Sequence, residues 1–276
     1  MASFNLIRGL KSLIRPFYIP IYNSLNFLWD LRLNSVKSVK ENGKEIFKVY
    51  DYGQLVRYRA NSFESKEPET LDWIRGFEID DNLLDIGGNI GIYSLYAAYN
   101  GIDVIAIEPD ALNYALLNLN IRLNNYGEKI VPYCIAIHDK NKFSKFNISS
   151  YRWGGALNSF DNTLNYKGEE FTPVHSQGVF GISLDSFIEN LPSVPNHLKI
   201  DVDGNENLIL LGAKELLKNK ALKSILIELD ETRGDYESSK TLIQQSGFKL
   251  VKKTHAAIYN QGKFSSIYNH IFKRET

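Results

Sequence analysis

Residues 82–91, NLLDIGGNIG, combine a short apolar run with a glycine-rich turn. The run 82–86 predicts a buried strand, and the amphipathic stretch 90–100 that follows the turn predicts a helix. Glycines between a strand and a helix let the backbone approach a ligand, and the start of the helix points unpaired N–H groups toward it. This stretch therefore predicts the ligand-binding turn of an α/β domain.

The same alternation continues along the chain. Apolar runs rich in Ile, Val and Leu predict further strands at 103–108, 129–137, 198–202 and 224–229. Amphipathic stretches predict further helices at 111–124, 206–218 and 236–246. Such alternation predicts a mostly parallel, Rossmann-like sheet with helices on both faces. The runs 248–252 and 265–273 have no helix between them, and predict an antiparallel C-terminal hairpin at one edge of the sheet.

The chain divides into an extension and a main domain. Residues 1–60 are predicted to be an N-terminal helical segment with a β-hairpin, and residues 61–276 the Rossmann-like domain. Residues 139–181 are rich in Asn, Ser, Gly and aromatic residues and interrupt the strand–helix rhythm. So long a departure predicts an insertion over the active face of the domain.

Two local patterns define the extension. In residues 4–18, apolar side chains recur at i, i+3, i+4 and i+7 with basic residues on the other faces, which predicts a basic amphipathic helix. This helix is expected to pack on the main domain or a partner subunit, and the alternative is peripheral contact with an anionic membrane surface. Residues 45–52 and 55–60 predict a hairpin around Gly53, and Pro68 begins a predicted helix.

Composition limits the possible functions. The 276 residues carry 32 Lys and Arg against 32 Asp and Glu, and this balance argues against a dedicated nucleic-acid binder. The single cysteine excludes an intramolecular disulfide and a cysteine-based zinc site. No stretch has the roughly 18 uninterrupted apolar residues of a transmembrane helix, and the N-terminus does not resemble a signal peptide. We therefore expect a cytoplasmic protein.

The turn indicates which cofactor binds. Glu108 ends the next predicted strand, where a carboxylate accepts hydrogen bonds from the ribose hydroxyls of an adenosine. A dinucleotide-binding turn would read G-x-G-x-x-G, whereas this turn reads D-x-G-x-N-x-G, as in the first motif of S-adenosylmethionine enzymes. Asn89 is tolerated there because Asn adopts left-handed backbone conformations readily. The predicted cofactor-binding residues are Asp85, Gly87, Gly88, Asn89, Gly91, Glu108, Pro109 and Ala136.

Several motifs together resemble the FkbM-type methyltransferases. The resemblance spans roughly residues 68–273 and is carried by LDIGGNIGIYS (84–94), VIAIEP (104–109), NLNIRLN (118–124), SLDSF (183–187) and LKIDVDGNE (198–206). Asp203 departs from the family, where Glu is more frequent, and Gly88 stands where Ala is more frequent. The resemblance implies a seven-stranded Rossmann-like sheet and S-adenosylmethionine as cofactor. It also implies methyl transfer to a hydroxyl of a sugar, glycan or related natural-product acceptor.

Three carboxylates follow the strand predicted at 198–202. Ligands of open α/β sheets bind beyond the carboxyl ends of the strands, and a hydroxyl needs a base before it can attack a methyl group. Asp201 is the predicted base, with Asp203 and Glu206 as orienting or acceptor-binding partners. The alternative is that Asp203 or Glu206 only caps the following helix.

Other functions remain open at this point. Asp201, Asp203, Glu228 and Asp230 end neighbouring strands and could hold Mg²⁺ or Ca²⁺, although no metal is the preferred prediction. His175 and His255 are further candidates for the proton acceptor, and Tyr151, Trp153 and Phe180 could stack on a sugar. The competing functions are a non-catalytic binding module of the same fold and an NAD(P)-linked oxidoreductase.

Overall fold

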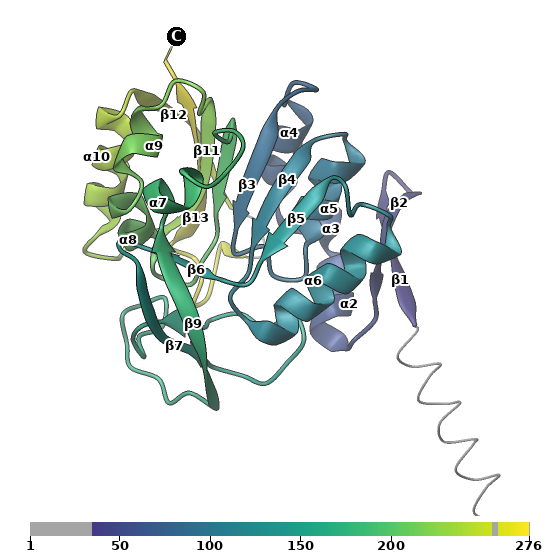
Figure 1. Cartoon of the computed structure of the whole chain (residues 1–276). Helices are drawn as coiled ribbons and strands as arrows, with labels where there is room; N and C mark the ends of the chain where they lie inside the picture. Colours follow the sequence, from purple (N-terminus) through teal and green to yellow (C-terminus); the bar gives the residue numbers. More distant parts are fainter. Residues whose placement is uncertain (1–34, 256–258, 276) are drawn as a thin grey trace, which may run out of the picture.

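The computed structural model describes residues 35–255 and 259–275. Seven strands form one sheet in the order β12-β13-β11-β10-β3-β4-β5 (Figure 1). The neighbouring strands pair in parallel except where β13 meets β11 and β12, so the predicted fold is confirmed. The strands are β3 (Asn82–Ile86), β4 (Asp103–Ile107), β5 (Ile130–Tyr133), β10 (His197–Ile200), β11 (Ser224–Asp230), β12 (Phe248–Thr254) and β13 (Ile267–Arg274).

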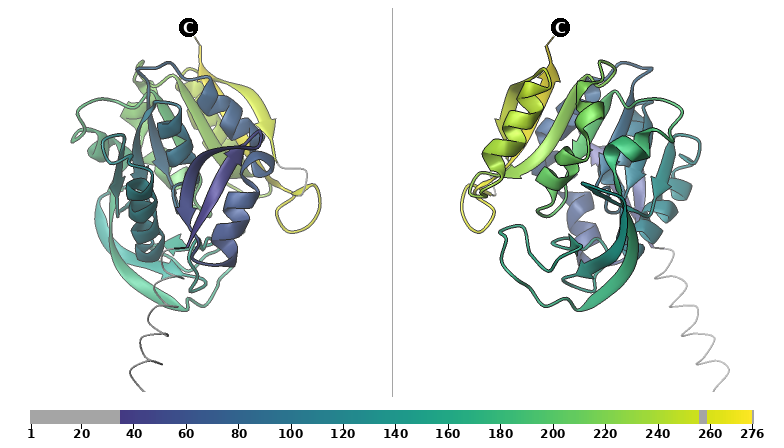
Figure 2. Two further views of the ribbon diagram at one scale, coloured as in Figure 1. Left: turned by 90° about the vertical axis from the view of Figure 1, so that its right-hand side faces the viewer. Right: turned by 60° about the vertical axis from the view of Figure 1, so that its left-hand side comes forward.

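Helices cover both faces of this sheet (Figure 2). Successive side chains of a strand point to opposite faces, so Leu83 and Leu84 of β3 lie in two separate hydrophobic clusters. The cluster around Leu83 includes side chains of α4 (Pro68–Arg75), α5 (Ile92–Tyr99) and α6 (Ala111–Leu123). The cluster around Leu84 includes side chains of α7 (Leu184–Ile188), α8 (Glu206–Leu211), α9 (Lys214–Lys218) and α10 (Tyr236–Gln245).

The hairpin of the extension lies earlier in the chain than predicted. It consists of β1 (Val36–Glu41) and β2 (Lys44–Tyr50), and both residues of its turn, Asn42 and Gly43, have positive φ, as tight hairpin turns require. The predicted second strand, residues 55–60, is instead part of the helix α2 (Gln54–Asn61). Val56 and Ala60 of this helix are buried one turn apart, and this helical spacing overrides the β-like composition.

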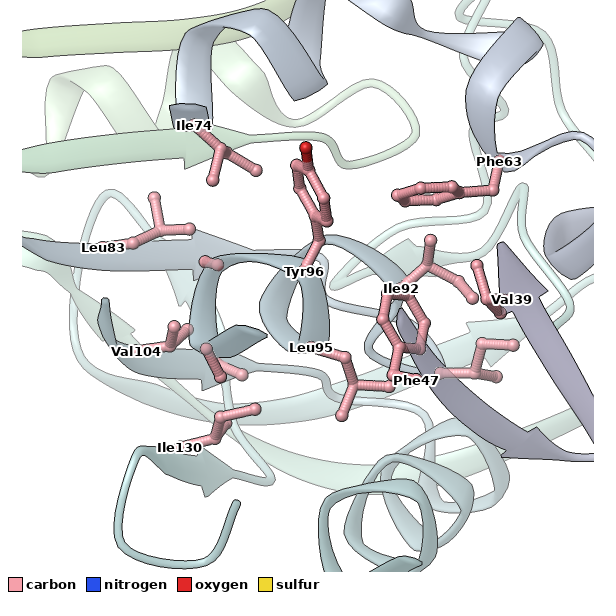
Figure 3. Close-up of a cluster of buried hydrophobic side chains, with 14 of the residues drawn as sticks. Val39, Phe47, Phe63, Ile74, Leu83, Ile92, Leu95, Tyr96, Val104 and Ile130 are labelled. Atoms are coloured by element: carbon pink, nitrogen blue, oxygen red, sulfur yellow. The ribbon is translucent and has the colours of Figure 1, made fainter. Parts of the chain in front are cut away.

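The extension shares its core with the main sheet. Phe63 of α3 (Phe63–Lys66) contacts Phe47 of β2, with ring centroids 5.6 Å apart, and Tyr96 of α5, with ring centroids 5.2 Å apart. Figure 3 shows these side chains together with Leu83 and Val104 of the sheet. The extension therefore joins the apolar cluster on one face of the main sheet. The helix predicted at 4–18 lies outside the described residues.

Two predicted elements are interrupted. The strand predicted at 129–137 splits into β5 and β6 (Ala136–His138), because the chain leaves the main sheet after Tyr133 and β6 pairs with β9 (His175–Ser183). Together with β7 (Lys142–Ile148) and β8 (Ser159–Phe160), these two strands form a second sheet. The helix predicted at 206–218 is interrupted at Gly212, where a Cβ atom would lie 2.3 Å from the carbonyl oxygen of His138.

Among the residues that the structure describes, no helix is both long and apolar enough to cross a membrane. The single cysteine, Cys134, is exposed between β5 and β6.

A series of buried hydrogen bonds lies at the amino end of β10. His197 Nε2 lies 2.9 Å from Asp81 Oδ2, and His197 Nδ1 lies 2.7 Å from Ser224 Oγ. The Trp73 indole N–H donates to Ser224 Oγ at 2.8 Å. A neutral imidazole that donates to Asp81 and accepts from Ser224 satisfies the whole chain of hydrogen bonds. Burial also favours the neutral form, and lowers the pKa of His197 to about 4.

Because of His197, we expect the folded state to lose stability in mild acid. The unfolded chain takes up a proton at His197 below its ordinary pKa of about 6.5, whereas the folded chain does so only near 4. The unfolded state therefore binds more protons between these values, and stability falls as pH falls through this window. We expect a loss of about 3 kcal/mol. Urea denaturation from pH 7 to pH 4 should show a weaker pH dependence for His197→Gln, and equal dependence of both proteins would contradict this explanation.

Candidate active site

The carboxyl ends of β3 and β10 lie level with one another and with the last part of β11. Ile86 of β3 pairs with Ile200 of β10, which pairs with Ile227 of β11. The next residues, Gly87, Asp201 and Glu228, therefore lie in a row across the sheet, the first two just beyond their strands and Glu228 near the end of β11. All three line one pocket of about 420 Å³, a size typical of small-molecule sites. The predicted position of the site, beyond the ends of the parallel strands, is where this pocket lies.

The turn after β3 is held by close backbone packing. Gly87 has φ +83°, and a Cβ atom there would lie 1.9 Å from the Asp201 carbonyl oxygen. Gly91 has φ +90°, and its Cβ would lie 2.5 Å from Leu117 Cδ1. Asn89 has φ +52°, the left-handed conformation that the sequence predicted. Gly87 and Gly91 therefore have structural reasons for being glycine.

Asp85 lies beneath this turn and does not line the pocket. Its side chain is buried, and Oδ2 accepts a hydrogen bond from Ser94 Oγ at 2.6 Å. The other oxygen, Oδ1, has no hydrogen-bond partner among the described residues and lies 4.0 Å from Lys199 Nζ. Burial raises the pKa of Asp85 above its ordinary value. Its geometry fits a role in ordering the loop rather than the direct contact with a cofactor that was predicted from the sequence.

Glu108 faces the pocket beside the turn. Its two carboxylate oxygens accept backbone N–H groups of Asn89 and Asp110, each at 2.8 Å. Burial raises the pKa of Glu108 to about 8. Of the predicted cofactor-binding residues, the pocket is lined by Gly87, Asn89, Glu108, Pro109 and Ala136, but not by Asp85, Gly88 or Gly91.

Asp201 forms an ion pair with a buried lysine. Lys199 Nζ lies 2.8 Å from Asp201 Oδ2, and the Lys199 side chain is only 1% exposed. Burial alone would raise the pKa of Asp201, but the positive charges of Lys199 and Lys66 outweigh it and lower the pKa to about 2. Asp201 is thus held as an anion.

Asp203 and Glu206 line the same pocket and accept backbone hydrogen bonds. Asp203 accepts the N–H groups of Leu157 and Asn158, and Glu206, the first residue of α8, accepts the Gly204 N–H at 3.0 Å. Burial raises the pKa of Asp203 to about 6 and that of Glu206 to about 8. The structure therefore brings together all three residues that the sequence predicted as catalytic.

The segment 139–181 contributes a wall of the pocket. The carbonyl oxygen of Gly155 accepts hydrogen bonds from Asn89 Nδ2 at 2.7 Å and Asn113 Nδ2 at 3.0 Å. The carbonyl oxygen of Gly154 accepts from Arg59 Nε and Nη2 at 3.1 and 2.9 Å. These contacts connect the wall to the turn after β3, to α6 and to α2.

Several pocket residues were not identified from the sequence. Tyr58, Arg59, Lys66 and Glu67 come from the α2–α4 region, and Tyr259 and Phe264 come from the loop before β13. Of the earlier candidates, His255 lines the pocket but His175 does not, nor do Tyr151, Trp153 and Phe180. Trp153 packs on Tyr52 and Phe180 on Phe143, with ring centroids 5.0 and 4.9 Å apart.

The acidic residues do not form a recognisable metal centre. In the described part of the chain, no group of three or more His, Cys, Asp or Glu side chains is placed to hold a metal ion. Asp201 pairs with Lys199, and Asp230 Oδ1 accepts hydrogen bonds from the Thr232 N–H and hydroxyl groups.

Comparisons with known proteins identify the family. Methyltransferase 1 of Beauveria bassiana (strain ARSEF 2860) is 25% identical over 186 residues, which cover 63% of this chain and 74% of that protein. The crystal structure of a methyltransferase FkbM from Methylobacillus flagellatus KT has a TM-score of 0.51 at 15% identity. That alignment covers 79% of this chain and 52% of the other, so this chain spans about half the length of that protein. Because the methyltransferase FkbM domain matches residues 85–256, more than half of the chain, this protein belongs to that methyltransferase family.

Proposed function

We propose that the protein transfers a methyl group from S-adenosylmethionine to a hydroxyl group of a sugar, glycan or related natural-product acceptor. The observation that carries this proposal is the continuity of the pocket, which joins the turn after β3 and Glu108 to the carboxylates beyond β10 and at the end of β11. A cofactor at one end and an acceptor at the other would share one cavity. Holding two reactants in this way can lower a barrier by about 7–11 kcal/mol.

The residues at the turn suit S-adenosylmethionine. Glu108 offers a carboxylate to the ribose hydroxyls, and Ile107, Ala136 and Ile137 offer an apolar surface to the adenine. When bound, S-adenosylmethionine supplies an activated methyl group. The chain therefore needs mainly to orient the acceptor hydroxyl and remove its proton.

The acceptor end combines charge with aromatic surface. Asp201, Asp203 and Glu206 are the proposed orienting groups, because each lines the pocket and each is held by a hydrogen bond or ion pair. Tyr58 and Tyr259 line the same pocket, and aromatic faces of this kind can pack against a sugar ring. This arrangement supports a polyhydroxylated acceptor.

A thermal-shift titration with S-adenosylhomocysteine tests the proposal. At about 100 times the dissociation constant, binding stabilises a protein by about 2.7 kcal/mol, which predicts a rise of about 5–10 °C for this chain. NADH should produce no shift. Asp201→Asn should retain the shift and lower methyl transfer, whereas Glu108→Ala should lose the shift. A shift with NADH alone would exclude the proposed cofactor, and no shift with either compound would favour a non-catalytic binding module.

A further inference from the structure

One carboxylate of the pocket differs from all the others in its contacts. Six pocket carboxylates accept at least one hydrogen bond or ion pair: Glu67, Glu108, Asp201, Asp203, Glu206 and Asp230. Within residues 35–255 and 259–275, the Glu228 carboxylate has no such partner although it lines the same pocket. No hydrogen bond or ion pair from the described residues therefore occupies its oxygens.

The fold places Glu228 close to the cofactor turn. It follows Ile227 on β11, and Asp201 follows Ile200 on β10, so the two residues are neighbours across the sheet. Asn269 of β13, which also lines the pocket, pairs with Glu228 on the other side. Neighbouring strands are about 4.8 Å apart, so Glu228 lies two strand spacings from Gly87. An acceptor that reaches the cofactor turn across Asp201 would pass this carboxylate.

We propose that Glu228 accepts the proton of the acceptor hydroxyl during methyl transfer, an inference that rests on the proposed function. The hydroxyl oxygen forms a bond to the methyl carbon as the carbon–sulfur bond breaks, and that bond's electron pair stays on sulfur. The sulfonium becomes a neutral thioether. The hydroxyl proton moves to an oxygen of Glu228, which is ionised when S-adenosylmethionine is bound, so charge and atoms balance.

Asp201, the base predicted from the sequence, is less suited to this step. Lys199 already donates to Asp201 Oδ2, so a proton arriving there must compete with an ammonium group. Glu228 is surrounded mainly by negative charge, from Asp201 and Asp203 beyond β10 and from Glu67, with Lys66 as the nearby cation. Burial and these charges raise the pKa of Glu228 well above its ordinary value. A carboxylate in this environment binds a proton more readily than one held by lysine.

The proton released when a ligand binds tests whether Glu228 lies beside the reacting methyl group, and this test needs no acceptor. S-adenosylmethionine carries a positive sulfonium where S-adenosylhomocysteine has a neutral thioether. If Glu228 lies beside the reacting methyl group, the sulfonium should lower its pKa and release a fraction of a proton that the thioether does not release. This release leaves Glu228 as the anion that can accept the hydroxyl proton. Isothermal titration calorimetry at pH 7.5, in two buffers of different ionisation enthalpy, measures this difference between the two compounds.

Three variants make the test specific. Glu228→Gln should remove the difference in proton release while both compounds still bind. Asp201→Asn should keep a difference, because Asp201 is already an anion in the free protein, although a smaller one, because the Asp201 charge helps to raise the pKa of Glu228. The exposed Glu237→Gln, on α10, is a matched control and should behave as the wild type. If the difference in proton release is unchanged in Glu228→Gln, the proposal is overturned. If the difference is lost in Asp201→Asn alone, the proton belongs to Asp201.

A stability measurement separates this role from a structural one. A carboxylate whose pKa is raised by folding destabilises the folded state once the pH exceeds its unfolded value of about 4.5. Glu228→Gln should therefore raise the melting temperature at pH 8 and leave it nearly unchanged at pH 4. A lower melting temperature at pH 8 would show that Glu228 supports the fold instead. Failure of either compound to bind the wild type would contradict the proposed function itself.

Discussion

Gly87→Ala is expected to abolish cofactor binding and to destabilise the protein by several kcal/mol. The new Cβ would lie 1.9 Å from the carbonyl oxygen of Asp201, which belongs to the backbone beyond β10 and cannot rotate away. Forcing an extra carbon into packed structure costs about 1–3 kcal/mol, and the residue's φ of +83° adds strain that glycine does not experience. The turn and the end of β10 must then separate, which would disturb both ends of the pocket.

Gly88→Ala is the matched control, because the two glycines are adjacent. Gly88 does not have a positive φ, and its Cβ would meet only ordinary contacts, the nearest being Ala106 Cβ and Asp85 Oδ2 at 3.6 Å. This variant should fold and bind S-adenosylhomocysteine nearly as the wild type does. Urea denaturation and calorimetry of both variants check the contrast. Equal behaviour of the two would show that the close approach at Gly87 does not control the site.

The main sheet and one end of the pocket could be predicted because their signals are local. The β3 strand, its turn and Glu108 are adjacent in sequence or separated by a single helix, so periodicity and spacing are enough to place them. The carboxylates beyond β10 were predicted for the same reason. The separate roles of these carboxylates could not be predicted, because each role depends on which side chain the carboxylate contacts. Lys199 provided a signal that was overlooked, since a lysine inside an apolar strand requires a buried counter-charge.

The remaining pocket residues gave no comparable signal. Lys66 and Glu67 stand in a charged run that is typical of a solvated surface, yet their side chains are largely buried and their charged atoms lie 2.6 Å apart. Tyr259 and Phe264 follow β12, in the loop that leads into β13. Only the folded chain brings these segments to the pocket, because they are distant in sequence from the motifs that identify the family. The hairpin was predicted too late in the sequence for a similar reason. At residues 55–60 the burial of one face of α2, which only the folded chain shows, decides between helix and strand.

Lys199→Met is expected to destabilise the protein by about 3–5 kcal/mol, the usual cost of removing one partner of a buried ion pair. Lys199 is the cation that contacts Asp201, and it also lies 4.0 Å from the buried, unpartnered oxygen of Asp85. Its Nζ also lies 5.1 Å from the centre of the Tyr93 ring. Methionine is a suitable replacement because it keeps a long, unbranched side chain without the charge. Both carboxylates would then remain in a poorly solvated site with no cation in contact. Urea denaturation at pH 7 measures the loss.

A double-mutant cycle assigns this loss to charge rather than to packing. Because Lys199→Met leaves Asp201 without its counter-ion, adding Asp201→Asn to that variant should recover stability, although Asp201→Asn alone should reduce it. Lys218→Met, which breaks an exposed ion pair with Glu215 on α9, should change stability little. Additive effects of the two substitutions at Lys199 and Asp201 would show that they act independently. Coupling would show instead that the buried lysine and the Asp201 carboxylate stabilise the folded chain as a pair.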